Sequence, residues 1–389
     1  MILKHFTDND LYKFSVMLAI QRLYPWSWVK YEFMNRNNTK FPKGFAQRMR
    51  KEVDAMVKLK LTKEEKRFIE KRCYFFDPVF IDFLEGYQYD PGEVKIEQNG
   101  GELKVTIEGY WYRTVLWEVP LMAIISELYF DMLGVVPEGV EERAIAKAKA
   151  LAGLKADYSD FGTRRRFSFE VQDKVVGLLQ KNSGEYFKGT SNMYLAMKYN
   201  TTPIGTMPHE WFMYHGALFG YRAANIKALE AWVEVYQGSL GIALTDTYTT
   251  DSFFKSFSQK QAKLFDGVRW DSGDPLEFTD KTIDFYERTR IDPLSKTIVF
   301  SDSLNIERVK EIKAHVAGRI HDTYGIGTFF SNDVGVKALN MVIKLVAIKA
   351  NRKDSDYLYA VKLSDVPGKH TGNEKEIELS QMTLGLEHN

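Results

Sequence analysis

The sequence contains almost no cysteine: Cys73 is the single one in 389 residues. Disulfide bonds within the chain are therefore excluded, which fits a reducing compartment, and we expect a cytoplasmic location. Net charge is also nearly absent, because 53 basic and 52 acidic residues leave a formal charge of +1. The overall charge gives no attraction to nucleic acid or to an anionic membrane, and we expect neither as a partner.

Long apolar runs and common metal or nucleotide motifs are missing too. The most hydrophobic stretch, 119–133, contains Glu127 and is too short to span a bilayer, so it predicts a buried helix. Residues 1–10 become acidic early and lack an apolar core, so we expect no secretory signal peptide. The sequence has no His-x-x-x-His, no Cys-x-x-Cys and no GxxxxGK(S/T). A zinc enzyme and a P-loop protein are therefore not expected, and no metal-ligating set is predicted.

What is present is an ordinary globular composition, 44% hydrophobic and 27% charged, over a length that suggests about two domains. The first 118 residues predict α+β structure. A capped helix is expected over 7–24, a hairpin around Asn99–Gly101, and an extension of the sheet over 111–117.

From about residue 119 the pattern changes to short apolar runs that end in polar or glycine clusters and are followed by helical segments. Parallel strands are expected at 156–161, 186–187, 201–204, 240–244, 267–270, 297–300 and 316–320. The segments between them have helical periodicity, among them a single helix expected over 210–236. This repetition predicts an irregular β/α barrel or an open parallel sheet, whose post-strand loops gather on one face.

The last part of the chain returns to the earlier pattern. Segments 339–348 and 357–363 alternate as strands, and we expect them to rejoin the N-terminal sheet. The prediction is thus an α/β plus α+β protein. Residues 1–118 and 336–389 form a discontinuous α+β domain, and 119–335 form the β/α barrel.

The segment IGTMPHEWF carries the candidate nucleophile. Pro208 is expected to open a helix, which places His209 in its first turn beside unpaired backbone amides. The positive end of the helix dipole disfavours imidazolium and keeps the ring neutral, the form that acts as a nucleophile. The alternative is a histidine that caps the helix and packs on Trp211 or Phe212.

Two glycine-containing clusters at predicted strand ends suit phosphate. Arg164, Arg165 and Arg166 follow GT, and guanidinium groups there fit a phosphate or diphosphate; the alternative is a solvated helix start. In YGIGT, Gly327 and Thr328 lie in a tight loop whose amides and hydroxyl suit a phosphate.

Carboxylates follow two other predicted strands. In VRWDSGDP, Asp274 is explained as a helix cap, whereas Asp271 beside Arg269 is not; it either holds Mg²⁺ or stabilises an oxocarbenium-like sugar. Asp302 has the corresponding place in the next unit, where it either binds ribose hydroxyls or caps a helix. Together, the clusters indicate chemistry on a phosphorylated sugar.

Seven ordered motifs resemble those of the nicotinate phosphoribosyltransferase family: DFGTRRRFS, KGTSN, GTMPHEWF, GIALTD, VRWDSGDP, VFSDSLN and YGIGT. TDNDLYKF and WEVPLMAIISE extend the resemblance over nearly the whole chain. It implies a type II phosphoribosyltransferase fold. The implied reaction converts nicotinate and phosphoribosyl diphosphate into nicotinate mononucleotide and diphosphate, coupled to ATP hydrolysis, with Mg²⁺, in NAD salvage.

The resemblance also implies roles at matching positions. His209 is the histidine that ATP phosphorylates, with Asp271 and Arg269 completing the catalytic group. The resemblance implies that Tyr12, Thr206 and Arg269 contact nicotinate and that Gly327 and Thr328 bind the 5′-phosphate. It also implies that Arg164 lies near the base and the phosphates, and that Asp271 and Asp302 lie beside the ribose and the diphosphate.

Ser191 separates close relatives. Nicotinamide-specific relatives carry Asp where this chain has Ser191, and the serine removes a charge that would repel a carboxylate, so nicotinate is favoured. The alternatives are a nicotinamide or quinolinate phosphoribosyltransferase, a barrel hydrolase using Asp271 and Asp274, and a non-catalytic phosphosugar-binding module. A homodimer, in which Arg164 serves the partner's site, is also left open.

Overall fold

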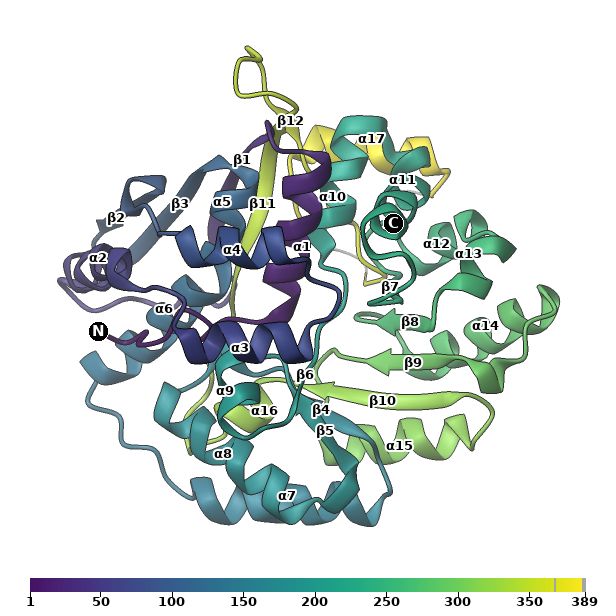
Figure 1. Cartoon of the computed structure of the whole chain (residues 1–389), viewed down its shortest axis with the longest axis horizontal. Coiled ribbons are helices and arrows are strands. Elements are labelled where there is room, and N and C mark those ends of the chain that lie inside the picture. The colour runs from purple at the N-terminus through teal and green to yellow at the C-terminus, as the bar shows by residue number, and fades with distance from the viewer. Residues whose placement is uncertain (367–368, 387–389) are drawn as a thin grey trace.

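The computed structural model describes residues 1–366 and 369–386 (Figure 1). It contains a five-stranded antiparallel sheet in the order β12-β11-β1-β3-β2 and a seven-stranded parallel sheet in the order β6-β5-β4-β10-β9-β8-β7. The strands are β1 (Trp28–Asn35), β2 (Val94–Asn99), β3 (Glu102–Tyr110), β4 (Tyr158–Asp160), β5 (Phe187–Thr190), β6 (Thr202–Pro203), β7 (Ile242–Leu244), β8 (Gly267–Trp270), β9 (Thr297–Phe300), β10 (His321–Ile326), β11 (Met341–Lys349) and β12 (Leu358–Tyr359).

Helices join and cover the two sheets. No helix within residues 1–366 and 369–386 combines the length and apolarity that a membrane crossing requires. The α-helices are α1 (Leu11–Leu23), α2 (Phe45–Ala55), α3 (Lys63–Arg72), α4 (Pro78–Gly86), α5 (Trp111–Thr114), α6 (Glu118–Met132), α7 (Val140–Gly153), α8 (Phe169–Asn182), α9 (Met193–Lys198), α10 (His209–Phe219), α11 (Tyr221–Tyr236), α12 (Thr250–Ser256), α13 (Gln259–Leu264), α14 (Pro275–Arg288), α15 (Ile306–Val316), α16 (Thr328–Ser331) and α17 (Glu374–Leu384).

The parallel sheet is a barrel that stays open at one point. Strands β4, β5 and β6 follow one another around it, as do β7, β8, β9 and β10, and β10 pairs with β4. β6 and β7 are therefore the two edge strands of the sheet, and the chain between them forms α10 and α11. This curled half-barrel confirms the predicted irregular β/α barrel, and it brings the ends of all seven strands to one edge.

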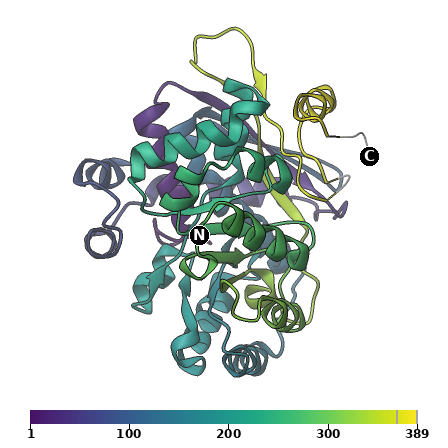
Figure 2. The ribbon, with the colours of Figure 1, turned by 90° about the vertical axis from the view of Figure 1, so that its right-hand side faces the viewer.

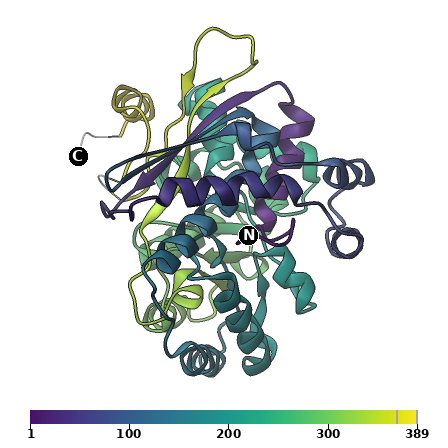
Figure 3. The same cartoon turned by 90° about the vertical axis from the view of Figure 1, so that its left-hand side faces the viewer.

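The C-terminal strands rejoin the N-terminal sheet, as expected. β11 pairs antiparallel with β1 from Trp28↔Lys349 to Asn35↔Met341, and β12 extends the sheet on the other side of β11. Figure 3 shows yellow-green β11 running beside purple β1. In Figure 2 the yellow C-terminal segment passes down toward the green barrel helices. The domain limits after residues 118 and 335 stay predictions.

Three expectations about elements are wrong. Segment 111–117 is helical rather than a strand, since α5 continues into a 3-10 turn, and a short apolar run does not by itself distinguish the two. Segment 316–320 is not a strand either: α15 runs through Val316, and β10 begins at His321. The expected single helix over 210–236 is broken at Gly220, whose φ of 83° ends α10.

The acidic segment before α1 serves the barrel rather than the helix. Helix α1 begins at Leu11, and its N-cap Asp10 makes no side-chain cap bond, so the expected capping by TDND is wrong. Asp8 instead accepts two bonds from the guanidinium of Arg166, at 2.7 and 2.8 Å, and both side chains are fully buried. Arg166 is thus a structural ion pair, and its assignment to phosphate is wrong.

Candidate functional site

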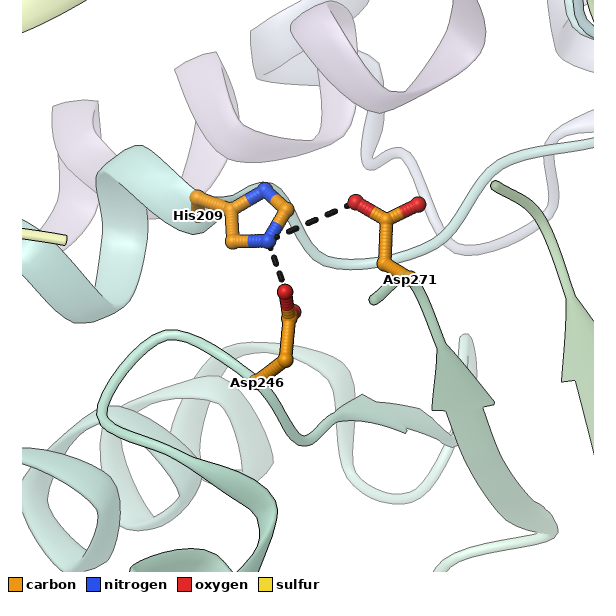
Figure 4. A group of neighbouring side chains, drawn as sticks. All are labelled: His209, Asp246 and Asp271. Carbon is orange, nitrogen blue, oxygen red and sulfur yellow. Dashed lines mark hydrogen bonds and ion pairs between the residues drawn. The ribbon is translucent and has the colours of Figure 1, made fainter. Parts of the chain in front are cut away.

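Two barrel loops meet at the imidazole of His209 (Figure 4). His209 is the first residue of α10, and Pro208 before it is extended, so the helix begins one residue later than expected. Asp246 follows β7 and Asp271 follows β8. Nε2 of His209 lies 2.8 Å from Oδ1 of Asp246 and 3.4 Å from Oδ2 of Asp271. Both carboxylates in Figure 4 point at the same ring nitrogen.

A lysine from the C-terminal segment completes this group. Nζ of Lys362 lies 2.8 Å from Nε2 of His209 and 2.9 Å from Oδ2 of Asp246. The Ser272 hydroxyl donates to the same Asp246 oxygen at 2.7 Å. Neither Asp246 nor Lys362 is among the site residues predicted from the sequence. Asp246 could have been found, because it follows a predicted strand just as Asp271 does, whereas nothing in the sequence links Lys362 to the barrel.

Burial and charge keep the imidazole unprotonated at neutral pH. Burial, and next the Lys362 ammonium, lower the pKa of His209 to about 4 against the opposing pull of Asp246. Burial alone would raise the pKa of the Asp246 carboxyl, but Lys362 and His209 hold it well below its usual range. The neutral ring agrees with the sequence-based expectation, and burial and Lys362 are two causes that the sequence did not indicate.

Arg269 links Asp271 to the loop after β6. Its guanidinium donates to the hydroxyl of Thr206, and its Nη2 lies 3.6 Å from Oδ2 of Asp271. The Ser301 hydroxyl donates to Oδ1 of Asp271 at 2.7 Å. Burial would raise the pKa of Asp271, but Arg269 and then His209 outweigh it and lower the pKa. Four predicted site residues, Thr206, His209, Arg269 and Asp271, therefore meet in one connected group.

The two other acidic positions behave differently from each other. Asp274 caps α14 by accepting from the backbone N–H groups of Leu276 and Glu277, as expected, which removes support for a hydrolase that pairs it with Asp271. Asp302 is not a helix cap, because Asn305 caps α15. Burial, and next the charge of Asp271, raise the pKa of Asp302.

A second group surrounds the start of α1. Nη1 of Arg164 lies 3.5 Å from Oε1 of Glu118. Tyr12 and Glu118 raise the pKa of Arg164, and together they outweigh burial, which lowers it. Burial, and next the charge of Glu118, raise the pKa of Tyr12. The charge of Asp271 also acts on Arg164, which connects this group to the first. Ser191 is buried, and its hydroxyl donates to Oδ1 of Asp10 at 2.8 Å.

The predicted phosphate loop lies at the end of β10. Gly327 precedes the short helix α16 and has φ −97° and ψ −112°, and Thr328 is that helix's first residue. Both residues are partly exposed at the strand edge that carries the other loops. A Cβ added to Gly327 would lie 3.3 Å from the backbone oxygen of Phe161, so the loop is closely packed.

Three side chains here have the donor types of a metal site. One ligand atom each from His209, Asp246 and Asp271 lie within 4.8 Å of one another. The Lys362 ammonium already lies against two of the three side chains. A cation is therefore supplied by the chain itself, and we assign no metal to this group.

Two family models together match most of the chain. A family model described as the nicotinate phosphoribosyltransferase N-terminal domain matches residues 7–126, and one described as the nicotinate phosphoribosyltransferase family matches residues 156–388. The chain belongs to the nicotinate phosphoribosyltransferase family. The sequence-based resemblance is thereby confirmed, and the enzyme class is that of a phosphoribosyltransferase.

Individual family members match over nearly their whole length. A nicotinate phosphoribosyltransferase of Chromohalobacter salexigens is 50% identical over 97% of this chain and 97% of its own. A nicotinate phosphoribosyltransferase of Desulforapulum autotrophicum is 52% identical over 95% of this chain and 96% of its own. The crystal structure of nicotinate phosphoribosyltransferase from Porphyromonas gingivalis superimposes with a TM-score of 0.97 at 46% identity, covering 99% of this chain and 100% of that chain.

The buried ring predicts a loss of stability in mild acid. The pKa of His209 falls from 6.5 to about 4 on folding, so between these values the unfolded chain binds a proton that the folded one does not. Its contribution is complete above about pH 6.5 and is lost as the pH falls through this window. His209→Gln should abolish about 2 kcal/mol of the loss, measured by urea unfolding at about pH 7 and about pH 4.5.

The control is His321→Gln, at an exposed position on β10. It should keep the wild-type loss of stability in acid. Equal pH dependence in the two variants would contradict the burial of an uncharged His209.

Proposed function

We propose that this family member transfers the phosphoribosyl group of phosphoribosyl diphosphate to nicotinate, giving nicotinate mononucleotide and diphosphate in NAD salvage, with ATP hydrolysed to ADP and phosphate through a phosphohistidine. The observation that carries the proposal is the connected group of a neutral His209 with Arg269 and Asp271 at one strand edge. The relatives' names support the substrates.

His209 is proposed to accept the γ-phosphoryl group of ATP. This step requires the tautomer in which Nε2–H donates to Asp246 and the lone pair lies on Nδ1. Among the described residues, no side chain or backbone group hydrogen-bonds to Nδ1. Nδ1 then attacks phosphorus as the N–P bond forms and the P–O bond to ADP breaks, and ADP leaves with the electron pair. Water later cleaves the N–P bond and releases phosphate. The added negative charge near the substrate phosphates is the link by which ATP would affect the transfer step.

Asp271 and Arg269 are proposed to act on the transfer itself. Departure of diphosphate builds positive charge on the ribose C1, and the half-buried Asp271 carboxylate, whose pKa is lowered, stays ionised to stabilise it. The Arg269 guanidinium, oriented by Thr206, suits the carboxylate of nicotinate through charge-assisted bonds. Tyr12 near Arg164 supports a pyridine-binding face at the start of α1.

Neighbouring guanidinium groups support a diphosphate site. Burial, Arg164 and Arg36 lower the pKa of Arg165 to about 10, which an anion bound among these guanidinium groups would relieve. Arg164 contacts Glu118 of its own chain, which supports its use in its own site; a homodimer stays a prediction. Gly327 and Thr328 are proposed to bind the 5′-phosphate.

Asp302 fits Mg²⁺ better than Asp271 does. Among the described residues Asp302 accepts one hydroxyl and pairs with no cationic side chain, and its raised pKa marks a carboxylate whose charge is poorly compensated. Oxygen ligands of this kind suit Mg²⁺. The ion, when bound, would neutralise the leaving diphosphate. Asp271, in contrast, is already compensated by Arg269.

Ser191 predicts the choice of pyridine. Wild-type protein should turn over nicotinate in preference to nicotinamide. Ser191→Asp would add a carboxylate beside Asp10, now 2.8 Å from the serine hydroxyl, and should lower kcat/KM for nicotinate about tenfold or more. Ser191→Asn, which adds bulk without charge, should lower it less. A wild-type preference for the amide contradicts this assignment.

The phosphohistidine predicts which activity depends on ATP. With His209→Ala, formation of nicotinate mononucleotide should persist at a reduced rate and no longer respond to ATP, because the phosphoryl acceptor is gone while Asp271 and Arg269 remain. His321→Ala, at an exposed position, should keep the wild-type response to ATP. An ATP response that survives in His209→Ala would reject the role given to His209.

A further inference from the structure

The charges around His209 balance only when the ring is uncharged. Two carboxylates face Nε2: Asp246 at 2.8 Å and Asp271 at 3.4 Å. Two cations face those carboxylates: Lys362 at 2.9 Å from Asp246 and Arg269 at 3.6 Å from Asp271. An imidazolium would add a third cation to this buried group, directly against the Lys362 ammonium.

Lys362 is fixed in place by the backbone on both sides of it. Its N–H donates to the oxygen of Thr371 and its oxygen accepts from the N–H of Thr371, each at 2.8 Å. The N–H of Leu363 donates to the oxygen of Thr247 at 2.8 Å, close to Asp246 in the chain. The Lys362 side chain is 12% exposed. The C-terminal segment therefore delivers an ordered ammonium to the barrel loop.

We propose that Lys362 is a positioning residue that keeps His209 unprotonated and thereby able to accept a phosphoryl group. The inference rests on the proposed function of His209. Without Lys362, Asp246 and Asp271 would favour imidazolium, in which both nitrogens carry protons and no lone pair is left for attack. Lys362 is the second largest cause, after burial, of the lowered pKa of His209.

The other charged groups nearby do not replace Lys362. Arg269 pairs with Asp271 rather than with the ring. Two more carboxylates lie beyond this group, since the charge of Asp271 raises the pKa of Asp302 and that of Asp246 raises the pKa of Asp365. Removing Lys362 would therefore leave an excess of carboxylates around the imidazole, and the direction of the change is toward protonation.

The direct test follows the ring itself by NMR of histidine-labelled protein. In Lys362→Met the protonation midpoint of His209 should rise by about 1 to 3 pH units, and in Lys362→Arg it should stay near that of wild type. Lys281→Met is the matched control, since Lys281 pairs with Asp251 and Glu277 on the surface. Lys362→Gln replaces Lys362→Met if the latter does not fold. An unchanged midpoint in the neutral variant overturns the proposal, whether or not the protein makes nicotinate mononucleotide.

The kinetic test measures the rate of protein phosphorylation by ATP against pH. Loss of the positive charge should move the acid limb of the Lys362→Met profile to higher pH by the same shift, with the rate recovering as the pH rises, and Lys362→Arg should restore the wild-type profile. A loss of equal size at every pH would make Lys362 merely structural and overturns the proposal. If wild type itself makes no nicotinate mononucleotide, the proposed function fails, while the NMR midpoints still decide the role of Lys362.

Discussion

A buried imidazole whose neighbours carry two negative and two positive charges is the feature on which the site depends. Because the charges of Asp246 and Asp271 are compensated by Lys362 and Arg269, His209 can be buried without being protonated. The four charged groups come from both architectural parts: Asp246 and Asp271 from barrel loops, Arg269 from strand β8, and Lys362 from the segment that follows the antiparallel sheet. The return of the C-terminal strands to β1 is thus a requirement of the site as well as of the fold.

The imidazole of His209 lies in the connection between the two edge strands β6 and β7. The chain between β6 and β7 forms α10 and α11, and α10 starts at the strand edge with His209 as its first residue. The next residue, Glu210, is held by the buried ammonium of Lys13 and by the hydroxyl of Tyr31. Lys13 also pairs with Glu118, which contacts Arg164, so one chain of ionic contacts links the start of α10 to the proposed diphosphate side.

Sequence reasoning succeeds where one rule governs several segments. Parallel strands present their C-terminal ends at one edge, so His209, Arg269 and Asp271 were expected to be neighbours from their strand-end positions alone. The same rule covers Asp246, which was overlooked. The rule does not distinguish the neighbours Arg164 and Arg166, because it gives the position of the loop but not the direction of each side chain. The Arg166 guanidinium is buried against Asp8, whereas that of Arg164 is not. The rule could not predict Lys362, because the position of Lys362 depends on tertiary contacts of its segment with Thr247 and Thr371.

An uncharged His209 is proposed to accept a phosphoryl group. The most direct test is to incubate the protein with ATP labelled in the γ-phosphoryl group and then to map the labelled peptides. The account predicts that the label lies on the peptide that contains His209 and that added nicotinate and phosphoribosyl diphosphate speed its release. A protein that makes nicotinate mononucleotide in an ATP-dependent way but carries the label on another residue, or carries none, would contradict it.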